Sequence, residues 1–340
     1  MPIINAAAEK MAQDKRDIEP TVQSCKHNRR LRKCCFDKHE QLVAVRTLPS
    51  GAQGLAEVVR REANKELIVR KMMPHKQVTY YRGEDEIPEE VKILRDFLPD
   101  HDNVIKLLDY SVSPDHVTLF TPYYQGGDLF TLTYNYWQAQ IKVLAMVIWQ
   151  AFRQMSNALA FLHHGYVASS GRKRSQWRPI IHRDVKPANI FIRAPINPKV
   201  RPLQPQFVLA DFGLATVDMD NEEDVGTPEF QPPEGSTVTG AYDVWGLGAV
   251  IHAMCRENAP PIGPMPPDFP GGIHKWVRTP YARLPRSVAS KYSIKLEELM
   301  MKCFKVNPEE RIQSLSLARL IEDEFRPGGQ VGRRVMKPIN

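Results

Sequence analysis

The feature that most constrains the fold is a long apolar stripe in the middle of the chain. Between Leu144 and Leu162, apolar residues recur at the spacing of one helix face, over about five turns. Such a stripe is typical of a helix packed into a core. Similar patterns predict further helices at 241–255, 294–305 and 314–325.

The chain before this stripe has the pattern of a sheet. Four short apolar runs are rich in β-branched residues and are separated by glycine and polar residues, which is typical of strands. They lie at 42–45, 55–59, 66–69 and 117–120. Between Glu86 and Leu98 the apolar residues recur at helical spacing instead. The sequence therefore predicts a β-rich N-terminal lobe that contains one helix.

Composition bounds the class of protein. A chain of 340 residues with 42% hydrophobic content can bury a sizeable core. The 46 Lys and Arg residues exceed the 39 Asp and Glu residues, which leaves a net charge of +7. The excess gathers near the N-terminus, at 172–178 and near the end of the chain. We interpret these segments as solvated tails and a loop, and we expect no binding of nucleic acid.

The cysteines and the apolar runs bear on the compartment. The five cysteines lack the regular, even spacing of a disulfide framework, which favours a reducing environment. No stretch reaches the roughly 18 apolar residues of a membrane-spanning helix, and the N-terminus lacks an apolar core of secretory length. We therefore expect an intracellular protein, in the cytoplasm, the nucleus or both, without membrane association.

Two short strings carry the chemistry. The first, HRDVKPAN, runs from His182 to Asn189, and the second is Asp211-Phe212-Gly213, 27 residues after Asp184. In this order they resemble the catalytic loop and the metal-binding motif of the protein kinase family, serine/threonine branch. The resemblance implies the bilobal protein kinase fold, an α+β fold with a small β-rich N-lobe and a large, mainly helical C-lobe.

The resemblance implies a role for each polar residue of these strings. Asp184 would accept or orient the proton of the attacking hydroxyl, and Lys186 would neutralise charge on the transferring phosphoryl group. Asn189 and Asp211 would supply oxygen ligands to Mg²⁺, with Mn²⁺ as an alternative. Phe212 would be a regulatory position.

The nucleotide-binding residues that the resemblance implies are spread over the chain. Residues 48–56 resemble a glycine-rich loop, but Pro49 replaces its first glycine and Ala56 a usual valine. Lys71 matches the family lysine, and Glu90 matches its ion-pair partner, so both join the catalytic set. The expected ATP-binding residues are Leu48, Gly51, Gly54, Ala56, Val69, Lys71, Thr121, Pro122, Tyr124, Asp128 and Phe191.

Later motifs extend the resemblance to residue 311. Thr227, in a string similar to the end of the activation segment, should hydrogen-bond Asp184 and Lys186. Asp243 resembles the aspartate that holds the catalytic-loop backbone, and Arg311 resembles the buried partner of Glu234. The adjacent Arg70 and Lys71, and the stretch that begins at Tyr292-Ser293, are similar to the NIMA-related kinases.

Two segments are particular to this chain. The position of the usual activating phosphosite holds Glu223, and we hypothesise that it pairs with Arg183, helped by Glu222 or Asp224, as a permanent substitute for a phosphate. The alternative is that three acids merely solvate a loop. The basic segment 166–178 is longer than is common in the family, and we hypothesise that it docks an acidic partner; a neutral insertion is the alternative.

These expectations define a domain plan and a function. We expect a disordered basic extension at 1–40, a kinase domain at 41–326 and a C-terminal tail at 327–340. The domain would divide into an N-lobe at 41–121, a hinge at 122–127 and a C-lobe at 128–326. The predicted activity is transfer of the ATP γ-phosphate to serine and threonine hydroxyls of proteins. The alternatives are a pseudokinase or scaffold, suggested by Pro49, Ala56 and Pro232, and a kinase of small molecules.

Overall fold

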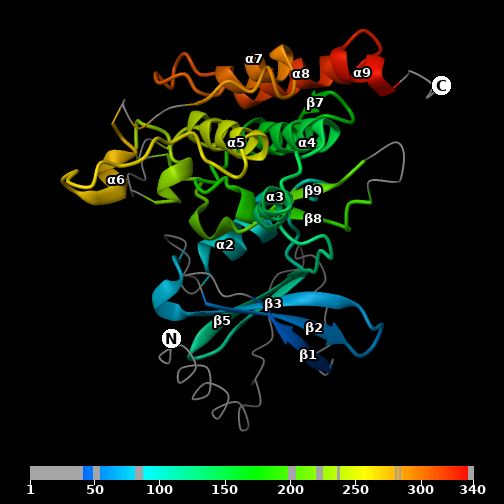
Figure 1. The fold of residues 1–340 in the computed structure, drawn as a ribbon. Coiled ribbons are helices and arrows are strands. Elements are labelled where there is room, and N and C mark those ends of the chain that lie inside the picture. The colour runs from blue at the N-terminus through cyan, green and yellow to red at the C-terminus, as the bar shows by residue number, and fades with distance from the viewer. Residues whose placement is uncertain are drawn as a thin grey trace. The chain divides into compact units, whose positions relative to one another are not determined.

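The fold falls into two compact units. The first comprises residues 1–78 and 108–121, and the second comprises 79–107 and 122–340. The computed structural model in Figure 1 describes residues 41–48, 54–80, 87–197, 204–219, 225–235, 238–279, 282 and 285–335. The expected extension at 1–40 lies outside the described residues.

The first unit is a five-stranded sheet with the strand order β1-β2-β3-β5-β4. Its strands are β1 (Leu42–Thr47), β2 (Leu55–Arg61), β3 (Leu67–Pro74), β4 (Asp109–Val112) and β5 (His116–Pro122). The pairs β1–β2, β2–β3 and β4–β5 are antiparallel. All four predicted strands are confirmed. The short β4 was not predicted, because Asp109-Tyr110-Ser111-Val112 is half-buried throughout and has no clear alternation.

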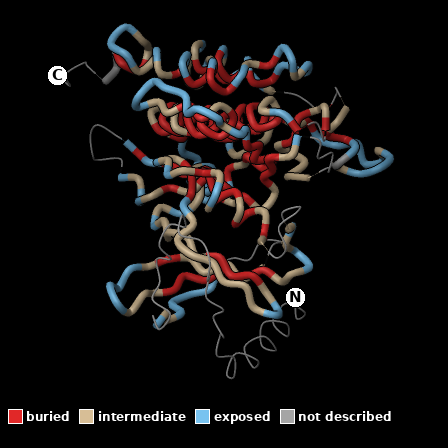
Figure 2. Tube along the Cα trace, turned by 180° about the vertical axis from the view of Figure 1, so that it is seen from behind, coloured by how far each residue is buried: buried red, intermediate tan, exposed pale blue. Residues whose placement is uncertain are grey.

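The core of the second unit is built on two buried helices. These are α4 (Ala145–His164), which confirms the stripe that predicted it, and α5 (Gly240–Cys255), in which every residue from Tyr242 to Cys255 is buried. Helix α4 packs against α5 and against α8 (Ser314–Phe325). Figure 2 shows the buried residues concentrated along these central helices, with exposed residues on the loops around them.

The remaining helices of the second unit are shorter. They are α2 (Glu89–Lys92), α3 (Leu129–Gln138), α6 (Gly272–Trp276), α7 (Ile294–Lys302) and α9 (Gln330–Val335). Helix α7 confirms the prediction at 294–305, whereas α3 and α6 were not predicted. Helix α9 lies within the segment that we expected to be a tail, and its Val331 is buried in the main core.

The helix predicted between 86 and 98 has an irregular form. The α-helical turn α2 passes at Ile93 into a wider π-helical turn that ends at Phe97. We expected this segment in the N-lobe, but it groups with the second unit. The physical reason is burial, since Ile93, Leu94 and Leu98 belong to the same hydrophobic core as α4.

Two small antiparallel pairs of strands complete the second unit. Strands β8 (Ile190–Ile192) and β9 (Phe207–Leu209) flank the two chemical strings. Strands β6 (Tyr166–Val167) and β7 (Arg172–Lys173) form a hairpin within the basic segment that we expected to be a loop. None of the helices in the described part of the chain has the length and apolarity needed to cross a membrane.

Candidate active site

The catalytic loop is held in place by Asp243, which is fully buried in α5. The backbone N–H groups of His182 and Arg183 donate to its two carboxylate oxygens, each at 2.8 Å. Arg183 has a φ of 64°, a left-handed conformation that a residue with a side chain adopts only when its surroundings hold it there. The carboxylate of Asp243 therefore fixes the backbone directly before Asp184.

The same carboxylate has a third partner that the sequence did not reveal. Nε2 of His163 lies 2.9 Å from Asp243 Oδ2, and Nδ1 of the same ring lies 2.9 Å from Ser314 Oγ in α8. All three side chains are buried. One signal was available: His163 lies four residues after Leu159 and continues the buried face of α4. A polar residue on such a face requires a polar partner.

Asp184, Lys186 and Thr227 form one connected group. Oδ1 of Asp184 accepts a hydrogen bond from Thr227 N at 3.0 Å and another from Thr227 Oγ1 at 2.8 Å. Nζ of Lys186 donates to Thr227 Oγ1 at 2.7 Å and lies 2.7 Å from Asp184 Oδ2. The structure thus brings the hydroxyl of Thr227 to a carboxylate and an ammonium that lie 43 and 41 residues before it in the sequence.

Asn189 and Asp211 stand at neighbouring ends of β8 and β9. The backbone N–H of Ala210 donates to Asn189 O at 2.9 Å, which sets the two chain segments side by side. The side-chain nitrogen of Asn189 donates to Asp184 O at 2.9 Å and to Asp184 Oδ2 at 3.0 Å. Because the amide nitrogen is committed to Asp184, the amide oxygen is the atom that remains for a cation.

This donor set fits Mg²⁺. One carboxylate and one amide oxygen are hard ligands, and Mg²⁺ is commonly held by one or two protein oxygens together with phosphates and water. Within the described ranges, no cluster of three or more His, Cys, Asp or Glu residues could hold a metal by itself. The residues present therefore suit a cation that arrives with a phosphate ligand.

Phe212 and His182 anchor the start of the activation segment. Their rings meet edge to face with centroids 4.8 Å apart, and Phe212 is fully buried. Nε2 of His182 lies 3.0 Å from Ala210 O. Nε of Arg183 donates to Leu214 O at 2.6 Å. The segment is therefore fixed on both sides of Asp211, which itself has a φ of 64°.

The acidic residues that we expected to pair with Arg183 lie outside the described residues; they are Glu222, Glu223 and Asp224. Thr216, a hydroxyl residue between Phe212 and Gly226, is buried and donates to Glu89 Oε1 in α2 at 3.2 Å.

In the N-terminal unit, the expected nucleotide-binding residues lie on β2, β3 and β5. The N–H of Leu48 donates to Ala56 O at 2.8 Å and closes the base of the loop between β1 and β2. Gly54 has a φ of 114°, while Gly51 and Pro49 lie outside the described residues. Lys71 is the cross-strand neighbour of Ala56. Val69 lies in β3 and Thr121 in β5, whereas Glu90 lies in α2 of the second unit.

The expected hinge residues that belong to the second unit lie between the end of β5 and the start of α3. The ring of Tyr124 lies 6.2 Å from the ring of Phe191, and burial raises the pKa of the Tyr124 hydroxyl. Pro122 is the last residue of β5. Asp128 caps α3, since its oxygens accept from Thr131 N at 2.7 Å and Thr131 Oγ1 at 3.0 Å. Its carboxylate therefore has a structural role, and each oxygen keeps a lone pair for a further donor.

The comparison with protein families agrees with this geometry. Residues 42–325 match the model of the protein kinase domain, and the chain therefore belongs to the protein kinase family. A protein kinase domain implies the use of ATP and a divalent metal in general. The bilobal fold class that the sequence predicted is confirmed.

Several curated protein kinases are similar to this chain, which spans 60% or less of the length of the three described next. Human serine/threonine-protein kinase Nek2 is 24% identical over 298 residues, 82% of this chain and 60% of that protein. The G2-specific protein kinase nim-1 of Neurospora crassa is 26% identical over 310 residues, 84% of this chain and 33% of that protein. CBL-interacting protein kinase 14 of Oryza sativa subsp. japonica is 24% identical over 302 residues, 86% of this chain and 60% of that protein. These matches confirm the resemblance to serine/threonine kinases, the NIMA-related kinases among them.

Proposed function

We propose that this chain transfers the γ-phosphate of ATP to serine and threonine hydroxyls of protein substrates. The observation that carries the proposal is the connected group of Asp184, Lys186 and Thr227, because phosphoryl transfer needs a positioned hydroxyl and a nearby cation more than it needs covalent chemistry.

Each residue of the group has a distinct task. A substrate hydroxyl within hydrogen-bond reach of Asp184 would be oriented by its carboxylate, which accepts the proton as the new P–O bond forms and the bond from the γ-phosphorus to the leaving ADP oxygen breaks. Lys186 stabilises the negative charge that builds on the transferred group. Thr227 bridges the two and holds their separation. Asn189 and Asp211 would hold Mg²⁺, which supplies neutralising charge at the phosphates when it is bound.

We extend the proposal to nucleotide binding and location. The expected ATP-binding residues of each unit would contact the nucleotide, with Gly54 allowing close approach of backbone. Among the described residues, Cys255 and Cys303 are free and buried, which supports a reducing, intracellular compartment such as the cytoplasm or nucleus.

A radioactive transfer assay on an array of serine, threonine and tyrosine peptides tests this function. Wild-type protein should label serine and threonine peptides, and Asp184→Asn, which preserves the shape of the side chain, should lower kcat by roughly 10²- to 10⁴-fold. Binding of a fluorescent ATP analogue to both proteins serves as the control. ATP binding without any labelling would favour the pseudokinase alternative over the enzyme.

We also propose that the acidic stretch at 222–224 takes the place of an activating phosphate by pairing with Arg183. Support comes from the position of Arg183, whose Nε is already fixed to Leu214 O. Glu223→Gln should lower kcat several-fold, because a neutral amide loses the charge pairing. Asp218→Asn, in the same segment, is the matched control and should change kcat much less. Equal activity in the wild type and in both variants would contradict this proposal.

We further propose that the β6–β7 hairpin docks an acidic partner. Arg172, Lys173 and Arg174 are exposed on it, and Trp177 secures its base through a hydrogen bond from Nε1 to Leu162 O at 2.9 Å. A fluorescent poly-glutamate peptide should bind with an affinity that falls with salt. Changing the three cations to glutamine should abolish this binding and leave the thermal unfolding temperature unchanged. Retained binding would identify the hairpin as a neutral insertion.

A further inference from the structure

Helix α3 presents an apolar face to solvent. Phe130, Tyr134, Trp137 and Ile141 are 46%, 41%, 45% and 60% exposed, and the spacing of four and three residues places the three aromatic side chains on one side of the helix. The three aromatic residues are the only exposed large aromatic side chains in the part of the chain that the structure describes. A contiguous apolar patch of this kind is typical of an interaction site, whereas single exposed apolar residues are ordinary.

The face is continuous. The rings of Phe130 and Tyr134 stack with centroids 6.2 Å apart, and those of Tyr134 and Trp137 meet edge to face at 5.5 Å. Ile141 follows the end of the helix, and its N–H donates to Tyr136 O at 2.9 Å, which keeps it beside the last turn. From Phe130 to Trp137 the face spans about 10 Å at the rise of a helix.

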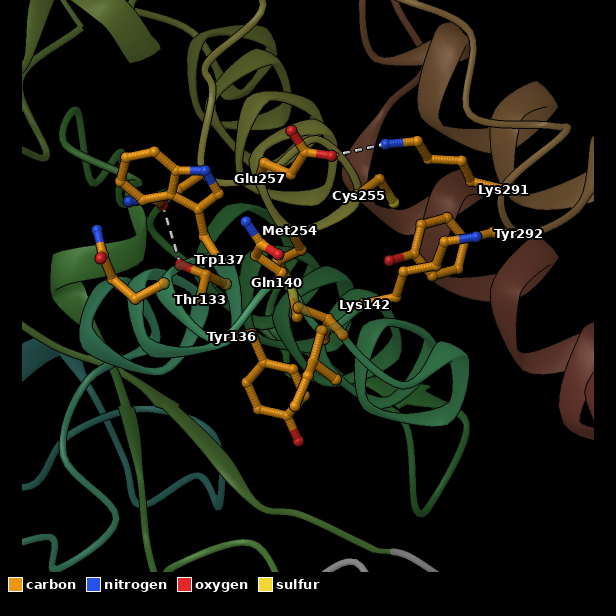
Figure 3. A pocket seen from close by; sticks show the side chains of 14 residues that line it. Thr133, Tyr136, Trp137, Gln140, Lys142, Met254, Cys255, Glu257, Lys291 and Tyr292 are labelled. Carbon is orange, nitrogen blue, oxygen red and sulfur yellow. Dashed lines mark hydrogen bonds and ion pairs between the residues drawn. The ribbon is translucent and has the colours of Figure 1, made fainter.

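A pocket of about 460 Å³ opens at the end of this face. It is lined by Trp137 and Ile141 from the face, by Met254 at the end of α5 and by Tyr292 before α7. Figure 3 shows Trp137, Met254 and Tyr292 around it. The volume lies within the range of about 300–1,000 Å³ that is usual for ligand sites. A side chain of a molecule bound along the face of α3 would therefore find room to be buried in this pocket.

The rim of the pocket holds an unusual concentration of backbone strain. Gln140, Glu257 and Asn258 have φ values of 55°, 60° and 66°, and they are three of the seven non-glycine residues with positive φ among those described. Thr133 Oγ1 donates to Asn258 Oδ1 at 2.9 Å, and Lys291 Nζ lies 2.9 Å from Glu257 Oε1. Strain of about 1–3 kcal/mol per residue persists only where contacts enforce it, and it clusters at functional sites.

The charges around the pocket indicate what would bind. Helix α3 carries no charged residue. The pocket is lined by Glu257, Lys291 and Lys142. Glu257 and Lys291 neutralise one another, while Lys142 is exposed and has no ion-pair partner among the described residues. With Lys142 and Lys291 against Glu257, the lining carries one more positive than negative charge, so this end of the face favours an acidic group on a ligand.

We propose that the exposed face of α3 and the pocket at its end dock an amphipathic helix of a partner protein. Its apolar side chains would lie along Phe130, Tyr134 and Trp137, one would enter the pocket, and an acidic residue beyond it would pair with Lys142. Phe130 and Tyr134 do not line the pocket, so the apolar face extends beyond it, which favours a helix of at least about two turns over a small molecule. The proposal does not depend on phosphoryl transfer.

A displayed library of 16-residue helical peptides, selected on the full chain, tests the proposal. Enriched peptides should carry apolar residues at helical spacing and an acidic residue near one end. Their affinity, measured by fluorescence anisotropy, should fall at least tenfold on Trp137→Ala and on Tyr134→Ser. Lys142→Glu should reverse the charge preference, so that a lysine-bearing version of the best peptide binds more tightly. Val306→Ser removes an equally exposed apolar side chain elsewhere and should change nothing.

Three results would overturn the proposal. The first is that no enriched peptide distinguishes the wild type from the α3 variants, with each variant shown to be folded by its circular dichroism. The second is that Lys142→Glu leaves the charge preference unchanged. The third is concentration-dependent dimerisation of the chain that Trp137→Ala abolishes, because the face would then be occupied by a second copy.

Discussion

The guanidinium of Arg311 donates two hydrogen bonds to the carboxylate of Glu234, from Nη1 to Oε1 at 2.6 Å and from Nη2 to Oε2 at 2.8 Å. The Arg311 side chain is fully buried, and its remaining donors reach the carbonyls of Lys305 and Ala241. The guanidinium also lies over the ring of Trp245, 5.0 Å from its centre. Arg311, which precedes α8, thus contacts the segment after Thr227, the start of α5 and the segment that follows α7.

Arg311→Ala should lower the free energy of unfolding by about 3–5 kcal/mol, because it leaves the Glu234 carboxylate buried without its partner. Arg311→Lys should lose less, since one ammonium keeps the charge but not the paired geometry. Urea denaturation followed by circular dichroism measures both. Arg326→Ala is the matched control, because its ion pair with Asp323 is exposed and should be worth less than about 1 kcal/mol. Equal losses of stability in Arg311→Ala and Arg326→Ala would contradict a stabilising role for the buried pair of Arg311 and Glu234.

Thr227→Ala should lower kcat by about tenfold or more in the peptide phosphorylation assay. The change deletes the hydroxyl that donates to Asp184 and accepts from Lys186, so the carboxylate and the ammonium lose their shared bridge. Thr227→Ser retains the hydroxyl and should retain most of the rate. If serine and alanine reduce kcat equally, the methyl group and not the hydroxyl is the important part of Thr227.

The sequence predicted elements best where one face is buried along their whole length. Helix α4 was predicted because its apolar face lies in the core from Val147 to His163. Helix α3 was not predicted, because only Leu129 and Thr133 are buried, whereas Phe130, Tyr134 and Trp137 are exposed. The segment from Glu89 to Phe97 was predicted as one helix, but periodicity does not show the change to a π-helical turn at Ile93.

The sequence predicted those residues of the candidate site that lie close together in short motifs. The order of His182 to Asn189 and of Asp211 to Gly213 indicated the chemistry, and the structure brings Thr227 to the same carboxylate. His163 and Ser314 were missed, because a histidine on a buried helix face indicates that a polar partner is needed but not which residue it is, and Ser314 is 151 residues away. Long-range contacts between polar residues leave no local pattern in a chain.

Gly54→Ala should destabilise the sheet of the N-terminal unit. A Cβ at this position would lie 2.2 Å from the carbonyl oxygen of Met72 in β3, so the strand backbone has to move. Gly171→Ala is the matched control, because Gly171 also has a positive φ, 64°, but open space around it. The control should lose about 1–2 kcal/mol from backbone strain alone, and Gly54→Ala should lose clearly more. Thermal unfolding measures both variants. Equal losses of stability would show that β3 can move to accommodate the Cβ without loss of free energy.

The last prediction concerns His252, a buried residue of α5. Its Nδ1–H donates to Ala259 O at 3.0 Å, and its Nε2 accepts the N–H of Arg286 at 2.9 Å. These partners require a neutral ring, since a protonated Nε2 could not accept. Burial, helped by the positive charges of Arg256 and Arg286, lowers the pKa of His252 to about 4. In the unfolded chain the imidazole titrates near its ordinary pKa of about 6.5.

The unfolded state therefore binds more protons than the folded state between about pH 6.5 and pH 4, and stability falls as the pH falls through this window. His252 alone should contribute a loss of about 1 kcal/mol between pH 7 and pH 5.5. Burial also lowers the pKa of His101 to about 4, so acid sensitivity should persist in part without His252. Urea denaturation of the wild type and of His252→Gln at the two pH values measures the difference. The variant should be less stable at pH 7 but lose less on acidification, and an equal loss in both proteins would contradict the assignment of a neutral His252.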